Sequence, residues 1–117
     1  MAINSDALER LIEALAEHPA VQRDGLQFSA VSDASFHQID PSILLWGWGD
    51  RGPGERGKAA LAYYDLDGQI VSVGLLAAGN QVTEVELWRG DGNALLSVPA
   101  RGDLWDMVPG RVYSPRA

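Results

Sequence analysis

Three short turn signals divide the later part of this chain and leave room only for antiparallel strand pairing. They are Asp67–Gly68, the segment 78–81 (AGNQ) and the segment 90–93 (GDGN). Asp-Gly is typical of tight hairpins because both positions tolerate a positive φ angle. A parallel pair needs a crossover much longer than these turns. The runs between the turns, residues 58–64, 69–76, 82–88 and 94–98, are therefore predicted to be antiparallel strands.

The segment before these runs predicts one helix and two more strands. Leu8, Leu11, Ile12 and Leu15 recur with the spacing of a single helical stripe, which predicts a helix over residues 5–18 that Pro19 ends. Residues 26–31 and 43–48 are predicted strands, and a short one is expected over 111–114. We expect one α+β domain spanning 1–117, with the N-terminal helix packed on an antiparallel meander sheet of about five or six strands.

The charge balance is strongly acidic and restricts the partners. Nine Lys and Arg residues stand against sixteen Asp and Glu residues, for a net charge of −7. Nucleic acids and anionic membrane surfaces would be repelled on average, so neither is an expected partner. A basic protein would be attracted. Self-association into a homo-oligomer is left open.

The composition also bears on location and covalent chemistry. The chain has no cysteine, so it has no disulfide framework, thiol nucleophile or Cys-based zinc site. Its first residues, MAINSDALERLIEALAEHP, carry charges throughout and lack the apolar run of a secretory signal. No stretch approaches the ~20 apolar residues of a membrane span. We expect a cytoplasmic protein.

The stretch GPGERGKA, from Gly52 to Ala59, is one residue short of the phosphate-binding signature G-x-x-x-x-G-K-[ST]. Ala59 replaces the hydroxyl that would bind Mg²⁺, and the next residues reach a hairpin turn too soon for the required helix. We interpret the stretch as a surface loop and expect no nucleotide cofactor. Two Arg-Gly-Asp triplets, Arg89–Asp91 and Arg101–Asp103, are likewise interpreted as turns.

Metal and acid–base motifs are sparse. Asp65 and Asp67 lack the third acid and the distal Glu of a calcium loop, so no metal site is predicted. His18 is expected at the helix C-terminus, where the helix dipole favours an imidazolium. His37 and Asp40 are close enough in sequence to interact, and a loop hydrogen bond is the favoured interpretation because no nucleophile motif accompanies them.

The best candidate surface is on the strand over residues 82–88. Glu84, Glu86 and Trp88 alternate, so their side chains should share one sheet face while Val85 and Leu87 point to the other. Two acids on a single strand do not flank a cleft as a catalytic pair does, which favours a partner-binding face. Trp46 and Trp48 also share a face of their strand and are weaker partner-binding candidates, with core packing as the competing interpretation.

The pattern VELWRGDGNALLSVP and the later DLWDMVPG resemble segments of small, acidic bacterial α+β domains, including immunity proteins of polymorphic toxin systems. The resemblance covers about a third of the chain. Such families bind a cognate toxin, which the resemblance implies for this chain without assigning a role to any residue.

Two functional hypotheses follow. The first is a non-enzymatic protein-binding domain, of the immunity or inhibitor type, that neutralises a basic toxin through Glu84, Glu86, Trp88, Trp46 and Trp48. The alternative is a small-molecule-binding domain or an enzyme with a pocket between helix and sheet, for which His37, Asp40 and Tyr64 are the candidate polar groups. The lack of an assembled catalytic motif favours the first.

Overall fold

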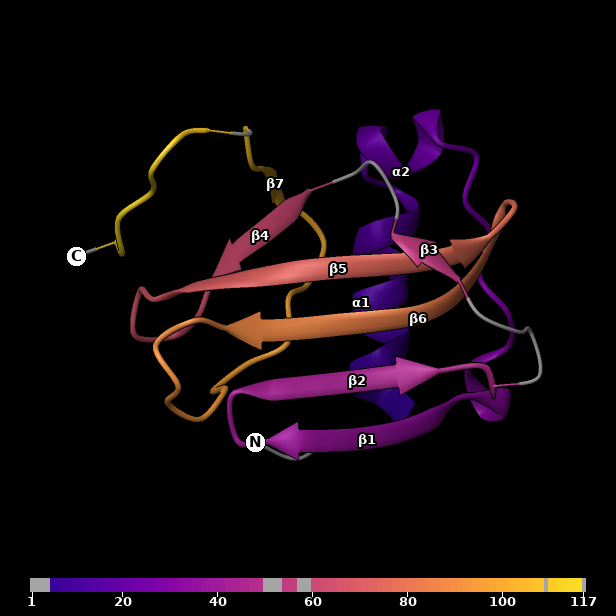
Figure 1. Cartoon of the computed structure of the whole chain (residues 1–117), viewed down its shortest axis with the longest axis horizontal. Coiled ribbons are helices and arrows are strands. Elements are labelled where there is room, and N and C mark those ends of the chain that lie inside the picture. Colours follow the sequence, from indigo (N-terminus) through magenta and orange to yellow (C-terminus); the bar gives the residue numbers. More distant parts are fainter. Residues whose placement is uncertain (1–4, 50–53, 57–59, 109, 117) are drawn as a thin grey trace.

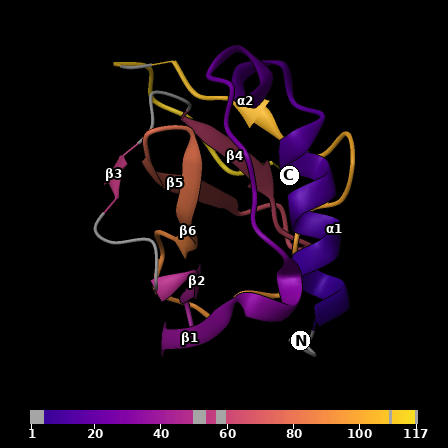
Figure 2. The same ribbon diagram turned by 90° about the vertical axis from the view of Figure 1, so that its right-hand side faces the viewer.

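The computed structural model describes residues 5–49, 54–56, 60–108 and 110–116. It has an α+β fold in which the N-terminal helix α1 (Ser5–Ala16) covers one face of an antiparallel sheet. Figure 1 looks onto the other face of this sheet, with α1 behind it, and Figure 2 shows the two layers from the side. The predicted fold class is confirmed.

In the described ranges the sheet has seven strands. In chain order these strands are β1 (Ser35–Asp40), β2 (Ile43–Gly47), β3 (Glu55–Arg56), β4 (Leu61–Tyr64), β5 (Ile70–Ala78), β6 (Gln81–Arg89) and β7 (Trp105–Asp106). The strand order is β1-β2-β6-β5-β4-β7, and β3 also pairs with β5. Consecutive strands form the hairpins β1–β2, β4–β5 and β5–β6, while β2 lies beside β6 although the 33 residues from 48 to 80 separate them in the sequence.

The helix ends earlier than predicted and a second one follows. α1 stops at Ala16, and Pro19 begins the short helix α2 (Pro19–Arg23), where its missing N–H is not needed. His18 is therefore the N-cap of α2. Its Nδ1 accepts a hydrogen bond from the backbone N–H of Ala20 at 3.1 Å.

The core lies between α1 and the sheet. The predicted helix stripe faces it, with Leu8, Leu11 and Leu15 buried and Ile12 partly buried. The facing side of the sheet contributes the alternate apolar residues of the strands, among them Val71, Val73, Leu75, Val85 and Leu87. The amphipathic spacing in the sequence thus determined which side of each element faces the core.

Several predicted strand boundaries were wrong. Residues 26–31 make only an isolated bridge, between Gln27 and Gln81, and residues 94–98 and 111–114 are irregular. The strands β1, β3 and β7 were not predicted. β1 is exposed at all six positions and so lacks the apolar alternation that marks a half-buried strand; its pairing with β2 forms it instead.

Candidate functional site

Glu84, Glu86 and Trp88 project from the face of the sheet opposite α1, which we call the outer face. Their neighbours Val85 and Leu87 are buried in the core, as the alternation predicts. Trp88 retains 50% of its accessible surface. The shared orientation of the three side chains is thereby confirmed.

The two glutamates have no cation directly across the sheet. Glu84 pairs in register with Gly47 and Leu76, and Glu86 with Leu45 and Gly74. Within the described part of the chain, no Lys, Arg or His nitrogen lies within 4.0 Å of either carboxylate. The pair therefore presents two carboxylates that form no ion pair on a half-buried surface.

A hollow of about 510 Å³ lies beside Trp88 and Glu86 on the outer face. Its walls are mainly apolar and include Ile43, Ala60 and Met107. Proteins usually bind small molecules in apolar hollows that carry a few polar groups. The hollow makes this region of the outer face a candidate binding site.

Arg56 reaches over this hollow from β3. A Cβ atom added to Gly74 would lie 2.8 Å from its Nη1 and 3.9 Å from the Cβ of Glu86. The absence of a side chain at position 74 therefore makes room for the guanidinium above the sheet, beside the glutamate.

Trp46 and Trp48 are not available to a partner, because both are in the core, where only 3% and 1% of their surfaces are exposed. Trp46 packs against Phe36 with ring centroids 5.5 Å apart. The indole Nε1–H of Trp48 donates to the backbone oxygen of Ala30 at 2.9 Å. Of the two sequence interpretations, core packing is therefore the correct one for both residues.

His37, Asp40 and Tyr64 do not converge on a common pocket. His37 and Asp40 lie on β1 at one edge of the sheet, whereas Tyr64 lies on β4, three strands further on from β2. Asp40 accepts hydrogen bonds from the N–H and Oγ of Ser42, which hold its pKa below the usual value. It therefore caps the β1–β2 turn. Tyr64 packs against Trp105 and beneath the guanidinium of Arg116.

The stretch Gly52–Ala59 lies largely outside the described residues. Gly54 and the two residues of β3 are described, and β3 pairs with β5. The two Arg-Gly-Asp triplets lie at turns, as predicted.

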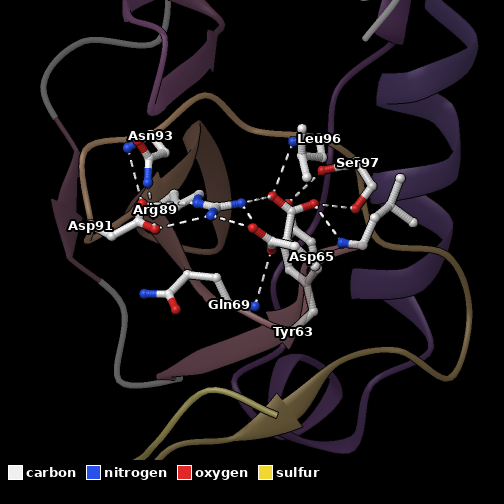
Figure 3. A network of polar contacts seen from close by, with 10 residues as sticks. Tyr63, Asp65, Gln69, Arg89, Asp91, Asn93, Leu96 and Ser97 are labelled. Atoms are coloured by element: carbon white, nitrogen blue, oxygen red, sulfur yellow. Dashed lines mark hydrogen bonds and ion pairs between the residues drawn. The ribbon is translucent and has the colours of Figure 1, made fainter. Parts of the chain in front are cut away.

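The first triplet also forms a contact that sequence reasoning missed. Arg89 is buried, and its guanidinium donates to Asp65 and Asp91 at 2.8–2.9 Å and to Asp67 at 2.5 Å (Figure 3). The side chain of Asp65 is itself completely buried. Asp65 also accepts hydrogen bonds from the N–H of Leu96 and the hydroxyl of Ser97. We call Arg89 and these three aspartates the Arg89 cluster.

The Arg89 cluster has marked electrostatic consequences. Hydrogen bonds from Arg89 hold the pKa values of Asp67 and Asp91 below their ordinary range, and the aspartates raise the pKa of Arg89. Next to it, burial raises the pKa of Tyr63, whose hydroxyl donates to the backbone oxygen of Ser97 at 2.7 Å. The cluster ties the β4–β5 turn to the end of β6 and to the loop 95–97.

A signal for this cluster was present in the sequence. Arg89 continues the alternation of Val85 and Leu87, so it falls on the core face of its strand. A cation at a core-facing position requires nearby acids, and Asp65 and Asp67 flank the neighbouring hairpin turn.

A scan against models of protein families, a search of curated proteins and a search of solved structures found no match to this chain. In the described ranges, no helix is long and apolar enough to span a membrane. The same ranges contain no group of three or more His, Asp or Glu residues placed to hold a metal ion.

Proposed function

We propose that this chain is a non-enzymatic protein-binding domain that docks a basic partner on its outer face. The observation that carries the proposal is the row Glu84, Glu86 and Trp88, in which a half-exposed indole adjoins two carboxylates that form no ion pair within 4.0 Å among the described residues. Exposed tryptophans are favoured anchors of protein interfaces, and unpaired charge gives specificity and fast association.

The partner class we propose is a basic toxin domain, with this chain as its immunity or inhibitor protein in the cytoplasm. The overall charge of −7 supports a cationic partner, because long-range attraction raises the rate of encounter. The resemblance of VELWRGDGNALLSVP to segments of immunity proteins is in accord with this class.

A small-molecule site is a second candidate, and the hollow of about 510 Å³ favours it. The residues for it would differ from those predicted, because His37, Asp40 and Tyr64 lie apart. The space between α1 and the sheet is filled by buried side chains such as Leu11 and Leu15, so the candidate hollow is on the outer face instead.

The proposal is tested with two charge-reversal variants matched in net charge. Glu84→Lys/Glu86→Lys changes the outer face. Glu9→Lys/Asp33→Lys changes one exposed residue of α1 and one of the short 3-10 helix Val31–Asp33. Proteins from the native host that bind the immobilised wild-type chain are identified and purified, and their affinities are then measured by titration calorimetry.

A basic partner should bind the Glu84→Lys/Glu86→Lys variant at least about tenfold more weakly, while the control variant retains most of the affinity. The difference should shrink at high salt because exposed charges are screened. Equal affinity of the two variants would remove the outer face from the proposal. If the purified partner is acidic, attraction between opposite net charges cannot explain the binding.

A further inference from the structure

Two hollows adjoin on the outer face. The hollow of about 510 Å³ and a second one of about 260 Å³ share three lining residues, Ser72, Trp88 and Met107. Trp88 therefore lines both hollows. We call the pair of hollows the Trp88 groove.

The larger end of the groove suits an apolar group. Ile43, Ala60 and Met107 line it together with the half-exposed indole of Trp88. Its two charged residues are of opposite sign, with Arg56 lying over Gly74 next to Glu86. Because these charges offset each other, this end has little preference for an ion.

The smaller end has a different chemistry. Arg111 lines it, together with the potential donors Gln69, Ser72 and Tyr113, and no carboxylate is among its lining residues. No carboxylate oxygen of the described residues lies within 4.0 Å of the Arg111 guanidinium.

We propose that the Trp88 groove binds a small organic carboxylate with an aromatic or aliphatic body. The body packs against Trp88 and Met107 in the larger hollow, and the carboxylate accepts hydrogen bonds at the Arg111 end. Guanidinium groups favour carboxylates because their donors match both oxygens, and an unpaired one beside an apolar space supplies the complementary charge. This inference does not depend on the proposed protein partner.

The probe is 4-phenylbutyrate, compared with its neutral amide and with 4-phenylbutylamine. Binding is followed by two-dimensional NMR of the isotope-labelled chain, in which the indole signal of Trp88 is identified from the spectrum of Trp88→Phe. The carboxylate should shift this signal saturably and bind at least about tenfold more tightly than the amide.

Matched variants assign the anion site. Arg111→Gln should remove the preference for the carboxylate over the amide, while Arg101→Gln, which changes the net charge equally at the α1 side of the molecule, should leave it unchanged. Preserved NMR spectra away from the groove verify that the variants fold.

Four outcomes would overturn the inference. They are equal binding of the carboxylate and the amide, tighter binding of the amine, an unchanged preference in Arg111→Gln, and no shift of the Trp88 signal at millimolar probe. Tighter amine binding would instead make Glu86 the dominant charge of the groove. The proposed protein partner would be unaffected by each of these results, since it is tested by the glutamate variants.

Discussion

Arg89 is the residue on which the buried electrostatics of this chain depend. It neutralises Asp65, which has no exposed side-chain surface, and it holds two further aspartates of the neighbouring turns. A buried ion pair contributes little when compared with an apolar replacement of both partners. Removal of one partner is costly, however, because the other charge stays buried without compensation.

Arg89→Met should therefore lower the free energy of unfolding by about 3–5 kcal/mol, because Asp65 would lose its counter-ion. The matched control is Arg101→Met, which removes an exposed arginine paired with Glu13 and Glu17 at 3.5 and 3.7 Å and should cost at most about 1 kcal/mol. Urea unfolding measures both. Similar losses in the two variants would contradict a special role of the Arg89 cluster.

The hydrogen bonds of Arg89 to Asp67 and Asp91 should also make the free energy of unfolding depend on pH. The folded-state pKa values of Asp67 and Asp91 lie below 3.8, so the unfolded chain binds more protons than the folded chain as the solution is acidified. Their contribution is complete above about pH 5 and is lost as the pH falls through the lowered pKa values.

Urea unfolding of the wild type between neutral pH and pH 3 should show this loss. In Arg89→Met the two pKa values return towards normal, and the decline with acid should be shallower. Parallel pH profiles for the wild type and the variant would show that the aspartates of the Arg89 cluster do not cause the acid sensitivity.

At the scale of elements, the C-terminal segment is held against the β4–β5 turn. The N–H of Arg116 donates to the oxygen of Gly68 at 2.8 Å, and Tyr113 packs on Trp105 with centroids 5.0 Å apart. Gly68 has φ +86° and adjoins this segment so closely that a Cβ atom would lie 1.9 Å from the oxygen of Arg116. Glycine at this turn thus serves both the backbone conformation and the docked segment.

Gly68→Ala and Gly102→Ala separate these two effects. Gly102 has a similar φ of +84° but no atom within 4 Å of an added Cβ, so its replacement should cost about 1–2 kcal/mol for the backbone alone. Gly68→Ala should cost more, because it also displaces the segment from the turn. Urea unfolding compares the two, and limited trypsin digestion should cleave after Arg111 faster in Gly68→Ala. Equal cost and equal cleavage would show that docking of the segment contributes nothing.

At the scale of the whole molecule, the sheet separates two kinds of tryptophan. Trp46 and Trp48 fill the core on the α1 side, and Trp88 borders the groove on the outer side. The same residue type therefore stabilises the fold on one face and is available for binding on the other.

Trp46→Ala should destabilise the chain by about 3–5 kcal/mol, because it leaves a cavity among packed side chains. Trp88→Ala should change the free energy of unfolding much less, since half of its surface is already exposed, and its effect should fall on binding of the partner and of 4-phenylbutyrate. Thermal and urea unfolding check the first difference, and titrations check the second. A large stability loss in Trp88→Ala would show that the indole is a structural group.

The sequence by itself determined the features that depend on neighbouring residues. The stripe of α1, the hairpin turns and the alternation of Glu84, Glu86 and Trp88 follow from backbone periodicity and turn chemistry, which act over a few residues. The general class of an antiparallel α+β fold follows from them, because short turns exclude parallel pairing.

Only the tertiary structure decided which segments meet. The pairing of β2 with β6 brings together residues that the sequence keeps far apart, and α1 covers one side of the sheet, so Trp46 is buried and Trp88 is exposed. Arg89 with Asp65, and Arg111 with Trp88, are likewise brought together from distant segments. Strand alternation indicates which side of a single strand is apolar, but it does not state which strands and helices meet there, because pairing and packing join elements that are remote in sequence.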